Sequence, residues 1–220
     1  LSVNLNKIAL LRNSRGSNTP SLEAYANKAI SLGVDGLTLH PRPDHRHATS
    51  NDALNISSLC KKKSLEFNLE GNPFSQPKNE FLGFYELCLQ AKPDQITLVP
   101  DGEGQLTSDS GWEPGFQDSE LKSFIAKVNE LNCRTSLFIN ADIHSVEYAS
   151  DMNFDRIEIY TGPFAQACLL DKNELQINCD KIKEVINRAK DLELGVNAGH
   201  DLSLDNIEVL RSCSSVDEVS

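Results

Sequence analysis

The chain has 220 residues, of which 39% are hydrophobic and 24% charged, and this composition is typical of a globular protein with a large core. The net charge of −11 argues against nucleic acid and anionic membrane surfaces as partners, because both require a basic protein face. Small phosphorylated substrates remain compatible with this charge, since they need only a local cationic or backbone N–H pocket.

Short apolar segments alternate along the chain with amphipathic ones, and this pattern predicts strands that alternate with helices. The expected strands cover residues 2–5, 36–39, 65–69, 96–99, 135–139, 156–159 and 194–197. The expected helices cover residues 20–32, 54–60, 81–91, 120–131, 143–149, 179–192 and 204–210. The first helix is expected to be capped by Thr19, with Pro20 in its first turn, and to stop at Gly33.

Strict alternation of strand and helix implies parallel strands joined by right-handed crossovers. The number of such units exceeds what most open doubly wound sheets would show, so we predict an α/β fold, a (β/α)8 TIM barrel, as a single domain over residues 1–220. The eighth strand is expected to start near residues 216–220, where the sequence stops. We therefore expect the rest of strand eight and the last helix to be missing, so that the domain is C-terminally incomplete.

Two longer loops are expected after the third and fourth strands, at residues 71–79 and 101–118. The second is rich in Gly, Asp and Ser, contains Trp112, and is a candidate active-site lid, since long loops in compact domains are often functional.

The six cysteines are scattered, without a CxxC pair, so we expect neither a zinc knuckle nor a compact disulfide framework. Buried thiols in a reducing cytoplasm are the expected alternative. The sequence contains no run of 18 apolar residues and no secretory signal pattern, so we expect no transmembrane span and a cytoplasmic location.

Charged side chains gather after the predicted strands, where barrel active sites lie. Residues 40–47 (HPRPDHRH) follow the second strand, and two prolines hold the segment extended, which suits a rigid anion-binding loop. A solvated charged loop is one alternative. A zinc or iron site at His45 and His47 is another, although the two arginines of the segment would repel a cation.

Glu70 ends the third strand, Glu158 lies inside the sixth, and Gly199-His200 follows the seventh. A buried glutamate is unfavourable unless it is paired, so Glu158 is expected to face a functional centre or an arginine. A glycine lets a backbone N–H approach an anion, and a histidine beside it suits acid catalysis near neutral pH. The alternatives are a surface carboxylate at Glu70 and an ordinary loop histidine at His200.

Seven segments of the chain, in this order, resemble the pyridoxine 5'-phosphate synthase family. The first two are residues 4–16 (NLNKIALLRNSRG) and 35–47 (DGLTLHPRPDHRH). The others are residues 68–70 (NLE), 98–100 (LVP), 136–139 (SLFI), 157–162 (IEIYTG) and 196–200 (VNAGH). Each segment is short, but together they extend the resemblance over nearly the whole chain.

The resemblance implies a ring-closing transferase of vitamin B6 biosynthesis that uses acid–base catalysis and neither a metal nor an organic cofactor. Such an enzyme condenses 1-deoxy-D-xylulose 5-phosphate with 3-amino-2-oxopropyl phosphate, giving pyridoxine 5'-phosphate, phosphate and water. The resemblance also implies a cytoplasmic homo-octamer.

The same resemblance implies roles for individual residues. His40 and Glu70 would accept protons, His200 would donate one, and Glu158 would stabilise charge in the intermediates. The residues implied for deoxyxylulose phosphate are Asn6, Lys7, Arg42, His47 and Thr107. Those implied for the amino-ketone phosphate are Asn4, Arg15 and the backbone at Asp201.

Three features depart from the family pattern. The family usually has Asp-His where this chain has Asn6-Lys7, and glycine where Asp201 stands. A Gly-His pair at the end of strand eight would fall just past Ser220. Two other functions stay open, namely a metal-dependent barrel hydrolase that uses His45, His47 and His200, and an inactive phosphate-sugar-binding barrel.

Overall fold

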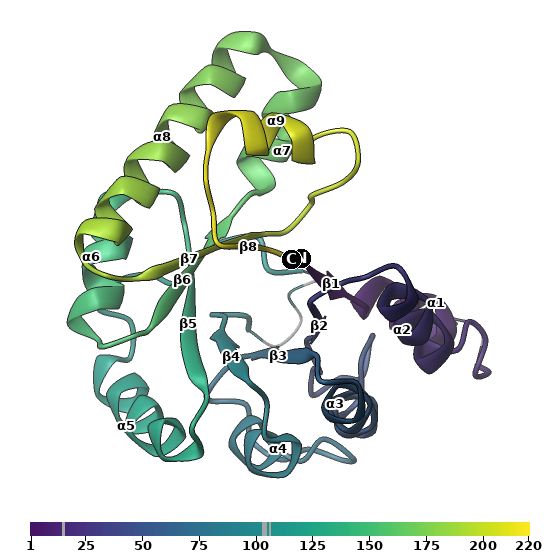
Figure 1. Cartoon of the computed structure of the whole chain (residues 1–220). Coiled ribbons are helices and arrows are strands. Elements are labelled where there is room, and N and C mark those ends of the chain that lie inside the picture. The colour runs from purple at the N-terminus through teal and green to yellow at the C-terminus, as the bar shows by residue number, and fades with distance from the viewer. Residues whose placement is uncertain (15, 103–104, 106) are drawn as a thin grey trace.

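Eight parallel strands, hydrogen-bonded in chain order from β1 to β8, form one sheet in the computed structural model, which describes residues 1–14, 16–102, 105 and 107–220. In Figure 1 the strands surround a common centre and the helices lie outside them. The strands are β1 (Ser2–Asn4), β2 (Gly36–Leu39), β3 (Glu66–Gly71), β4 (Gln95–Leu98), β5 (Arg134–Ile139), β6 (Arg156–Tyr160), β7 (Gly195–Gly199) and β8 (Glu218–Val219). The predicted barrel is confirmed, and each of the seven predicted strands lies within one or two residues of its observed bounds.

The eighth strand begins in the expected place, where Glu218–Val219 pairs in parallel with Asn197 and Ala198 of β7. Beyond it, the Ser220 hydroxyl lies 3.4 Å from Thr38 Oγ1 on β2, so the two ends of the sheet approach each other. Within the described residues the strand pairing runs from β1 to β8 without a β8–β1 ladder, and the barrel is nearly closed.

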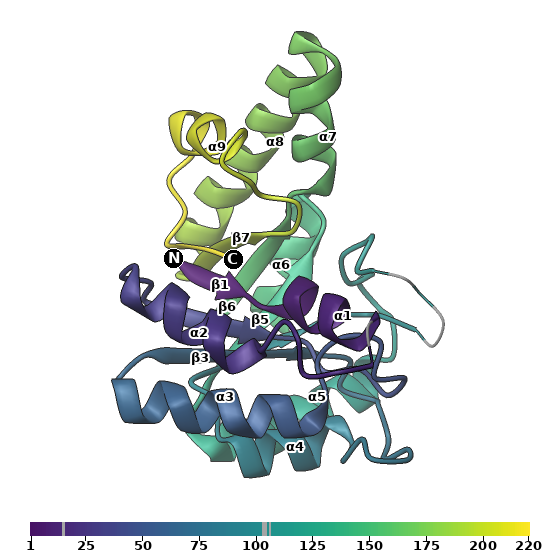
Figure 2. The ribbon, with the colours of Figure 1, turned by 90° about the vertical axis from the view of Figure 1, so that its right-hand side faces the viewer.

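The helices that cover the sheet are more numerous than predicted. They are α1 (Asn6–Ser14), α2 (Leu22–Ser31), α3 (Ser50–Lys63), α4 (Phe84–Ala91), α5 (Asp118–Val128), α6 (Ile143–Asp151), α7 (Gly162–Leu170), α8 (Lys172–Asp191) and α9 (Ile207–Cys213), with a 3₁₀ turn, η1, at Asn129–Leu131. Figure 2 shows α7 and the adjoining end of α8 projecting beyond the rest of the barrel.

Two of these helices, α1 and α7, were not predicted, because in neither are the apolar side chains confined to one face, the pattern that reveals an amphipathic helix. In α1 only Ala9 is buried, while Leu10 and Leu11 are half exposed. In α7 the apolar run continues into Leu169 and Leu170, which are exposed at its end.

The cap predicted for the next helix, α2, was wrong. Ser21, not Thr19, caps it, because the Ser21 side chain accepts a hydrogen bond from the Ala24 N–H. The predicted stop at Gly33 is confirmed, since Gly33 has φ +87, a value that favours glycine.

The core lies between the strands and the helices, as a barrel requires. Its outward-facing strand residues are fully or almost fully buried, and they include Leu37, Leu39, Leu69, Ile96, Leu98, Leu137, Ile139, Ile157, Ile159 and Ala198. The space inside the strands is polar instead. Thr38, Asn68 and Thr97 follow one another there, with Thr97 donating to Asn68 at 3.0 Å, and this polar row leads towards Glu158.

Part of the loop at residues 101–118 is anchored to the barrel. Trp112 is fully buried, its N–H donates to Phe138 O at 2.8 Å, and the Gly111 N–H donates to Asn140 at 2.9 Å. The lid predicted for this loop is only partly described, because its residues 103, 104 and 106 lie outside the described residues.

All six cysteines are free thiols, as expected; Cys60, Cys88, Cys179 and Cys213 are buried. Among the described residues, no helix is long and apolar enough to cross a membrane.

Candidate active site

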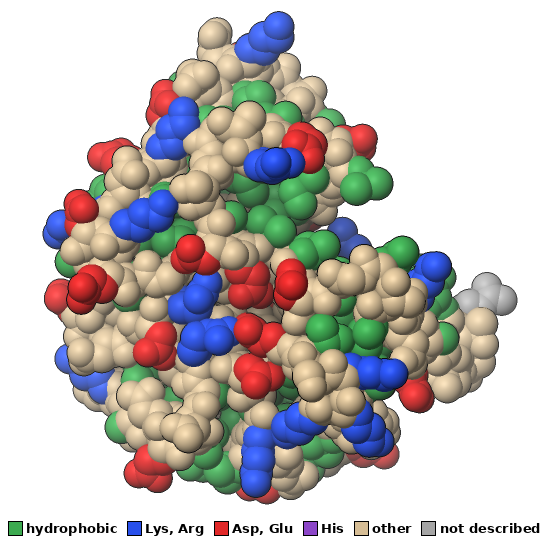
Figure 3. All heavy atoms as spheres, in the orientation of Figure 1, with side chains coloured by type: hydrophobic (Ala, Val, Ile, Leu, Met, Phe, Trp, Pro, Cys, Tyr) green, Lys and Arg blue, Asp and Glu red, His purple; other side chains and the backbone are tan. Residues whose placement is uncertain are grey.

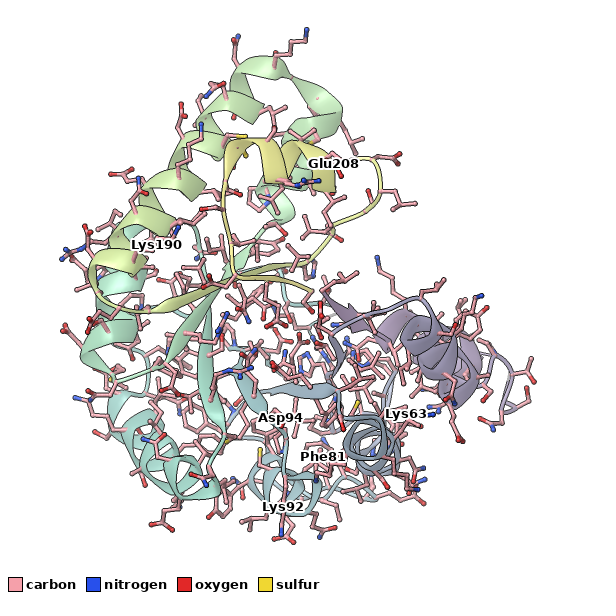
Figure 4. The ribbon with its side chains drawn as sticks, viewed as in Figure 1. Lys63, Phe81, Lys92, Asp94, Lys190 and Glu208 are labelled. Carbon is pink, nitrogen blue, oxygen red and sulfur yellow. The ribbon has the colours of Figure 1, made fainter. Side chains whose placement is uncertain are left out.

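A cavity of about 650 Å³ opens at the carboxyl ends of the strands, and we call it the main cavity. Eleven of the twelve residues to which the resemblance assigns roles line it: Asn4, Asn6, Lys7, His40, Arg42, His47, Glu70, Thr107, Glu158, His200 and Asp201. The twelfth, Arg15, lies outside the described residues. Figure 4 shows side chains from many elements converging on the space that the strands enclose. Parallel strands bring their carboxyl ends to one side of a barrel, and this geometry gathers residues that are far apart in the sequence.

His40 and Glu70 lie side by side at the ends of β2 and β3. Both are buried, with 4% and 8% of their surface exposed, and His40 Nδ1 lies 3.9 Å from Glu70 Oε2. Burial, and then the charges of Arg42 and His47, hold the pKa of His40 well below its usual range. Burial, and then the nearby charge of Asp101, raise the pKa of Glu70 to about 7. A neutral imidazole therefore stands beside a carboxyl group that exchanges its proton near neutral pH.

Arg42 is buried behind His40 and is held by two oxygens. Its Nη1 donates to the Gln105 carbonyl at 2.8 Å, and its Nη2 makes a short ion pair with Asp101 Oδ2. Asp101 also accepts a hydrogen bond from Ser108 Oγ at 2.7 Å. Arg42 lines the main cavity, and these two contacts fix the orientation of its guanidinium.

The segment at residues 40–47 is anchored by α1. Asn13 of that helix donates from Nδ2 to the carbonyls of His45 and His47, at 2.9 and 2.7 Å. His47 in turn accepts the Ala48 N–H at Nδ1, and its ring lies 5.8 Å from that of His40. Burial, and then the charge of Arg42, lower the pKa of His47 to about 4. His47 is therefore a neutral hydrogen-bonding group at physiological pH.

Glu158 stands at the bottom of the main cavity, inside the barrel, with 3% of its surface exposed. Burial, and then the charges of Glu70 and Glu218, raise its pKa well above the usual range, so the protonated acid is favoured. Thr97 Oγ1 lies 3.5 Å from its Oε2. Gly199 on the neighbouring strand makes room for it, because a Cβ there would lie 2.2 Å from Glu158 Oε1. Glu158 faces the cavity and pairs with no arginine among the described residues.

His200 is held by hydrogen bonds on both ring nitrogens. Nε2 lies 2.8 Å from Thr107 Oγ1, and Nδ1 lies 3.0 Å from Asp201 Oδ2. The Tyr160 ring meets the imidazole edge to face at 5.1 Å. His200 and Asp201 both have positive φ, 84° and 57°. The Asp201 carboxylate, which departs from the family pattern, is therefore directed to its neighbouring histidine.

The first strand supplies the opposite wall of the main cavity. Asn4 donates from Nδ2 towards Glu70 Oε2 at 3.4 Å, and its Oδ1 accepts the Asn6 N–H at 3.0 Å. Asn6 Oδ1 accepts the His40 N–H at 2.9 Å. Lys7 is exposed at the cavity wall. Asn6 thus orders the loop after β2, while Lys7 leaves its ammonium in solvent beside the site.

The residues of the metal hypothesis do not come together. His47 and His200 line the main cavity, but His45 does not, and its buried Nε2 has no hydrogen-bond partner. In the part of the chain that the structure describes, no group of three or more His, Cys, Asp or Glu side chains is arranged to hold a metal ion.

Two site residues were missed in the sequence, namely Asp101 and Tyr160. Asp101 follows β4 and Tyr160 ends β6, so both stand at the strand ends where the other candidates were found. The same rule would have selected Asp101 as a charged residue in that position. Nothing in the local sequence indicated that it pairs with Arg42, 59 positions away.

The sequence matches the family described as pyridoxal phosphate biosynthesis protein PdxJ over residues 1–220. It is 44% identical over 221 residues to the pyridoxine 5'-phosphate synthase of Xanthomonas campestris pv. campestris (strain B100), covering all of this chain and 86% of that protein. It is 41% identical to the protein of the same name from Xylella fastidiosa (strain 9a5c), covering all of this chain and 84% of that protein.

Solved structures with little sequence identity share the fold. The 3-keto-L-gulonate-6-phosphate decarboxylase of Vibrio cholerae is 12% identical with a TM-score of 0.59, covering 100% of this chain and 86% of that one. The thiamine phosphate pyrophosphorylase of Pyrococcus furiosus is 10% identical with a TM-score of 0.59, covering 99% and 82%.

Proposed function

The chain belongs to the PdxJ family and its activity is that of a pyridoxine 5'-phosphate synthase, and on this premise we propose that the main cavity is its active site. We further propose that its substrates are 1-deoxy-D-xylulose 5-phosphate and 3-amino-2-oxopropyl phosphate. The reaction joins an amine to a ketone, loses water, expels phosphate and closes an aromatic ring. Every one of these steps moves a proton, so several groups that change protonation near neutral pH are needed.

Two groups at the cavity wall suit proton abstraction. His40 is neutral because its pKa is lowered, so its imidazole is free to accept a proton. Glu70, with a pKa of about 7, is substantially ionised at physiological pH and is a stronger base than an ordinary carboxylate. We assign the role of proton acceptor to both.

His200 is the proposed proton donor. Its Nδ1 is directed to the Asp201 carboxylate, which fixes the ring and balances the positive charge when both nitrogens carry protons. Nε2 then presents its proton to the cavity beside Thr107. The edge contact of Tyr160 restricts rotation of the ring.

Glu158 is proposed to stabilise charge in the intermediates. Because its pKa is raised, it is a neutral acid whose O–H donates to negative charge that develops on a reacting oxygen. The cavity around it is enclosed by the strands, so this hydrogen bond is little weakened by water.

Phosphate binding is assigned to the cavity rim. Arg42, with His47, Asn6, Lys7 and Thr107, is proposed to hold deoxyxylulose phosphate, as its fixed guanidinium suits a phosphate group. Asn4, Arg15 and the backbone at Asp201 are proposed to hold the amino-ketone phosphate. Positioning both substrates in one cavity also contributes directly to the rate.

The observation that carries these assignments is that a neutral histidine, a carboxyl group with a pKa of about 7 and a doubly hydrogen-bonded histidine line one cavity. The test is to mix the two proposed substrates with the protein and follow the pyridoxine chromophore by absorbance and mass spectrometry. Product formation supports the assignment. Folded protein that forms no product would favour the phosphate-sugar binder without activity.

We also propose that the enzyme acts in the cytoplasm as a homo-octamer and needs no metal or organic cofactor. Exposed Leu169 and Leu170 at the end of α7 give an apolar surface suited to self-association. Analytical ultracentrifugation of the purified protein measures the oligomer, cell fractionation measures the location, and full activity after dialysis against a chelator would support independence from metal.

A further inference from the structure

Asp101 is a buried carboxylate that contacts the proposed machinery from behind. It follows β4, only 7% of its surface is exposed, and it does not line the main cavity. It lines instead a side cavity of about 290 Å³, which shares His40 and Arg42 with the main cavity as a common wall. Phe81, labelled in Figure 4, also lines this side cavity. Asp101 therefore lies behind that wall and contacts its residues from the far side.

The contacts of Asp101 reach two of these residues. Oδ2 forms the short ion pair with Arg42 Nη2, accepts Ser108 Oγ at 2.7 Å, and lies 3.8 Å from His40 Nε2. Arg42 is buried to the same degree, and its other nitrogen donates to the Gln105 carbonyl. A buried guanidinium without its carboxylate would move towards water or take another partner. The ion pair thus fixes the orientation in which Arg42 faces the main cavity.

The charge of Asp101 also reaches the proposed base. Glu70 is faced by Asn4, which donates to it, by His40, by the positive charge of Arg42, by the negative charges of Asp101 and Glu218, and by the protonated acid of Glu158. After burial, the charge of Asp101 is the largest contribution that raises the pKa of Glu70. Removal of that charge would make Glu70 easier to ionise and a weaker base.

We propose that Asp101 is a positioning residue of the synthase, which holds Arg42 against the phosphate of deoxyxylulose phosphate and keeps Glu70 a strong base. This inference rests on the roles proposed above for Arg42 and Glu70. It assigns Asp101 two separable effects, one through hydrogen bonding to the guanidinium and one through its negative charge.

Two variants separate these effects. Asp101→Asn keeps an oxygen that accepts from Arg42 but removes the charge, whereas Asp101→Ala removes both. Asp109→Asn is the matched control, because Asp109 lies in the same loop, is exposed, and accepts a hydrogen bond from Gln105 instead. Circular dichroism and thermal melting of each variant establish that it is folded.

Steady-state kinetics with the two proposed substrates give the first readout. For Asp101→Ala we expect the KM for deoxyxylulose phosphate to rise about tenfold or more, because the phosphate clamp is no longer oriented. For Asp101→Asn we expect a KM within about threefold of the wild type, together with an acidic limb of the kcat/KM profile that moves to lower pH. Asp109→Asn should match the wild type in both.

A lowered KM or an unchanged pH profile overturns the proposal. If Asp101 merely repels the substrate phosphate, both variants lower the KM. If its charge does not reach Glu70, the acidic limb of Asp101→Asn stays at the wild-type pH. A side chain with only a structural role would lower the melting temperature and leave the pH profile in place.

Two measurements on the protein without substrate keep the inference independent of the proposed reaction. ¹³C NMR of labelled glutamate follows the Glu70 titration, which should occur at lower pH in Asp101→Asn than in the wild type. Calorimetry with inorganic phosphate should show weaker binding to Asp101→Ala. A wild type that forms no product would refute the proposed substrates or roles, while an unchanged titration and unchanged phosphate binding would refute the role of Asp101.

Discussion

Replacing Glu70 with glutamine should make the protein more stable and far less active. The folded-state pKa of about 7 lies above the ordinary value of 4.5, so the folded protein binds the Glu70 proton more tightly than the unfolded chain does. The contribution of this carboxyl to stability is therefore greatest at low pH, where it is neutral, and falls as the pH rises from about 4.5 to about 7.

The size of the stability change follows from that difference in pKa. It corresponds to about 3 kcal/mol of lost stability above pH 7, since one pKa unit is equivalent to about 1.4 kcal/mol. A glutamine carries no charge, and its amide oxygen still accepts a hydrogen bond from Asn4. We expect Glu70→Gln to raise the melting temperature at pH 8 by up to about 10 °C, and to leave it nearly unchanged at pH 4.5.

The activity should change in the opposite direction. Removing the base should lower kcat by about 10²- to 10⁴-fold. In the wild type, Glu70 with a pKa of about 7 is about 10% ionised at pH 6 and about 90% at pH 8, so kcat/KM should rise about tenfold between them. Thermal melting at the two pH values and initial rates of product formation measure both effects.

Glu66→Gln is the matched control. Glu66 lies on the same strand at its other end, where it pairs with Arg134. In the view of Figure 3, acidic and basic side chains stand side by side at the centre of the molecule's face. Loss of the partly exposed pair of Glu66 and Arg134 should change stability by about 0–1 kcal/mol and leave the activity intact. Glu70→Gln with more than a tenth of the wild-type rate, or with no gain in melting temperature at pH 8, would refute the reasoning.

Three further substitutions test the rest of the site. His200→Ala should lower kcat about 10²-fold or more while the protein stays folded, and single-turnover rates would check this. Gly199→Ala places a Cβ 2.2 Å from Glu158 Oε1, so the Glu158 side chain must move. We expect kcat to fall with little change in KM. An unchanged kcat would show that Glu158 does not stabilise the intermediates. Asp201→Gly puts glycine at φ 57° and should stabilise the fold by up to about 1 kcal/mol, as melting curves would show. Initial rates should show a lower KM for the amino-ketone phosphate, because a carboxylate leaves the rim, and a lower kcat, because His200 Nδ1 loses its partner.

Local sequence patterns determined the barrel. Strand segments such as residues 36–39 and 156–159 were found because apolar runs of that length, separated by amphipathic stretches, permit few arrangements other than parallel strands with helices outside. The same reasoning located His40, Glu70 and His200, since barrel topology places every strand end at one rim. Chain order alone thus gave these three residues, without any knowledge of their distances, whereas the roles of the substrate-binding candidates came from the family resemblance.

Tertiary structure decided how those residues interact. The Asp101–Arg42 pair joins positions 59 apart, and the Thr107–His200 contact joins positions 93 apart, and no local pattern encodes either one. The helix α1 was missed because its role is to anchor the loop after β2 through Asn13 rather than to present an apolar stripe. The pKa values of Glu70 and His40 depend on burial and on neighbouring charges from other strands, and these exist only once the barrel has assembled.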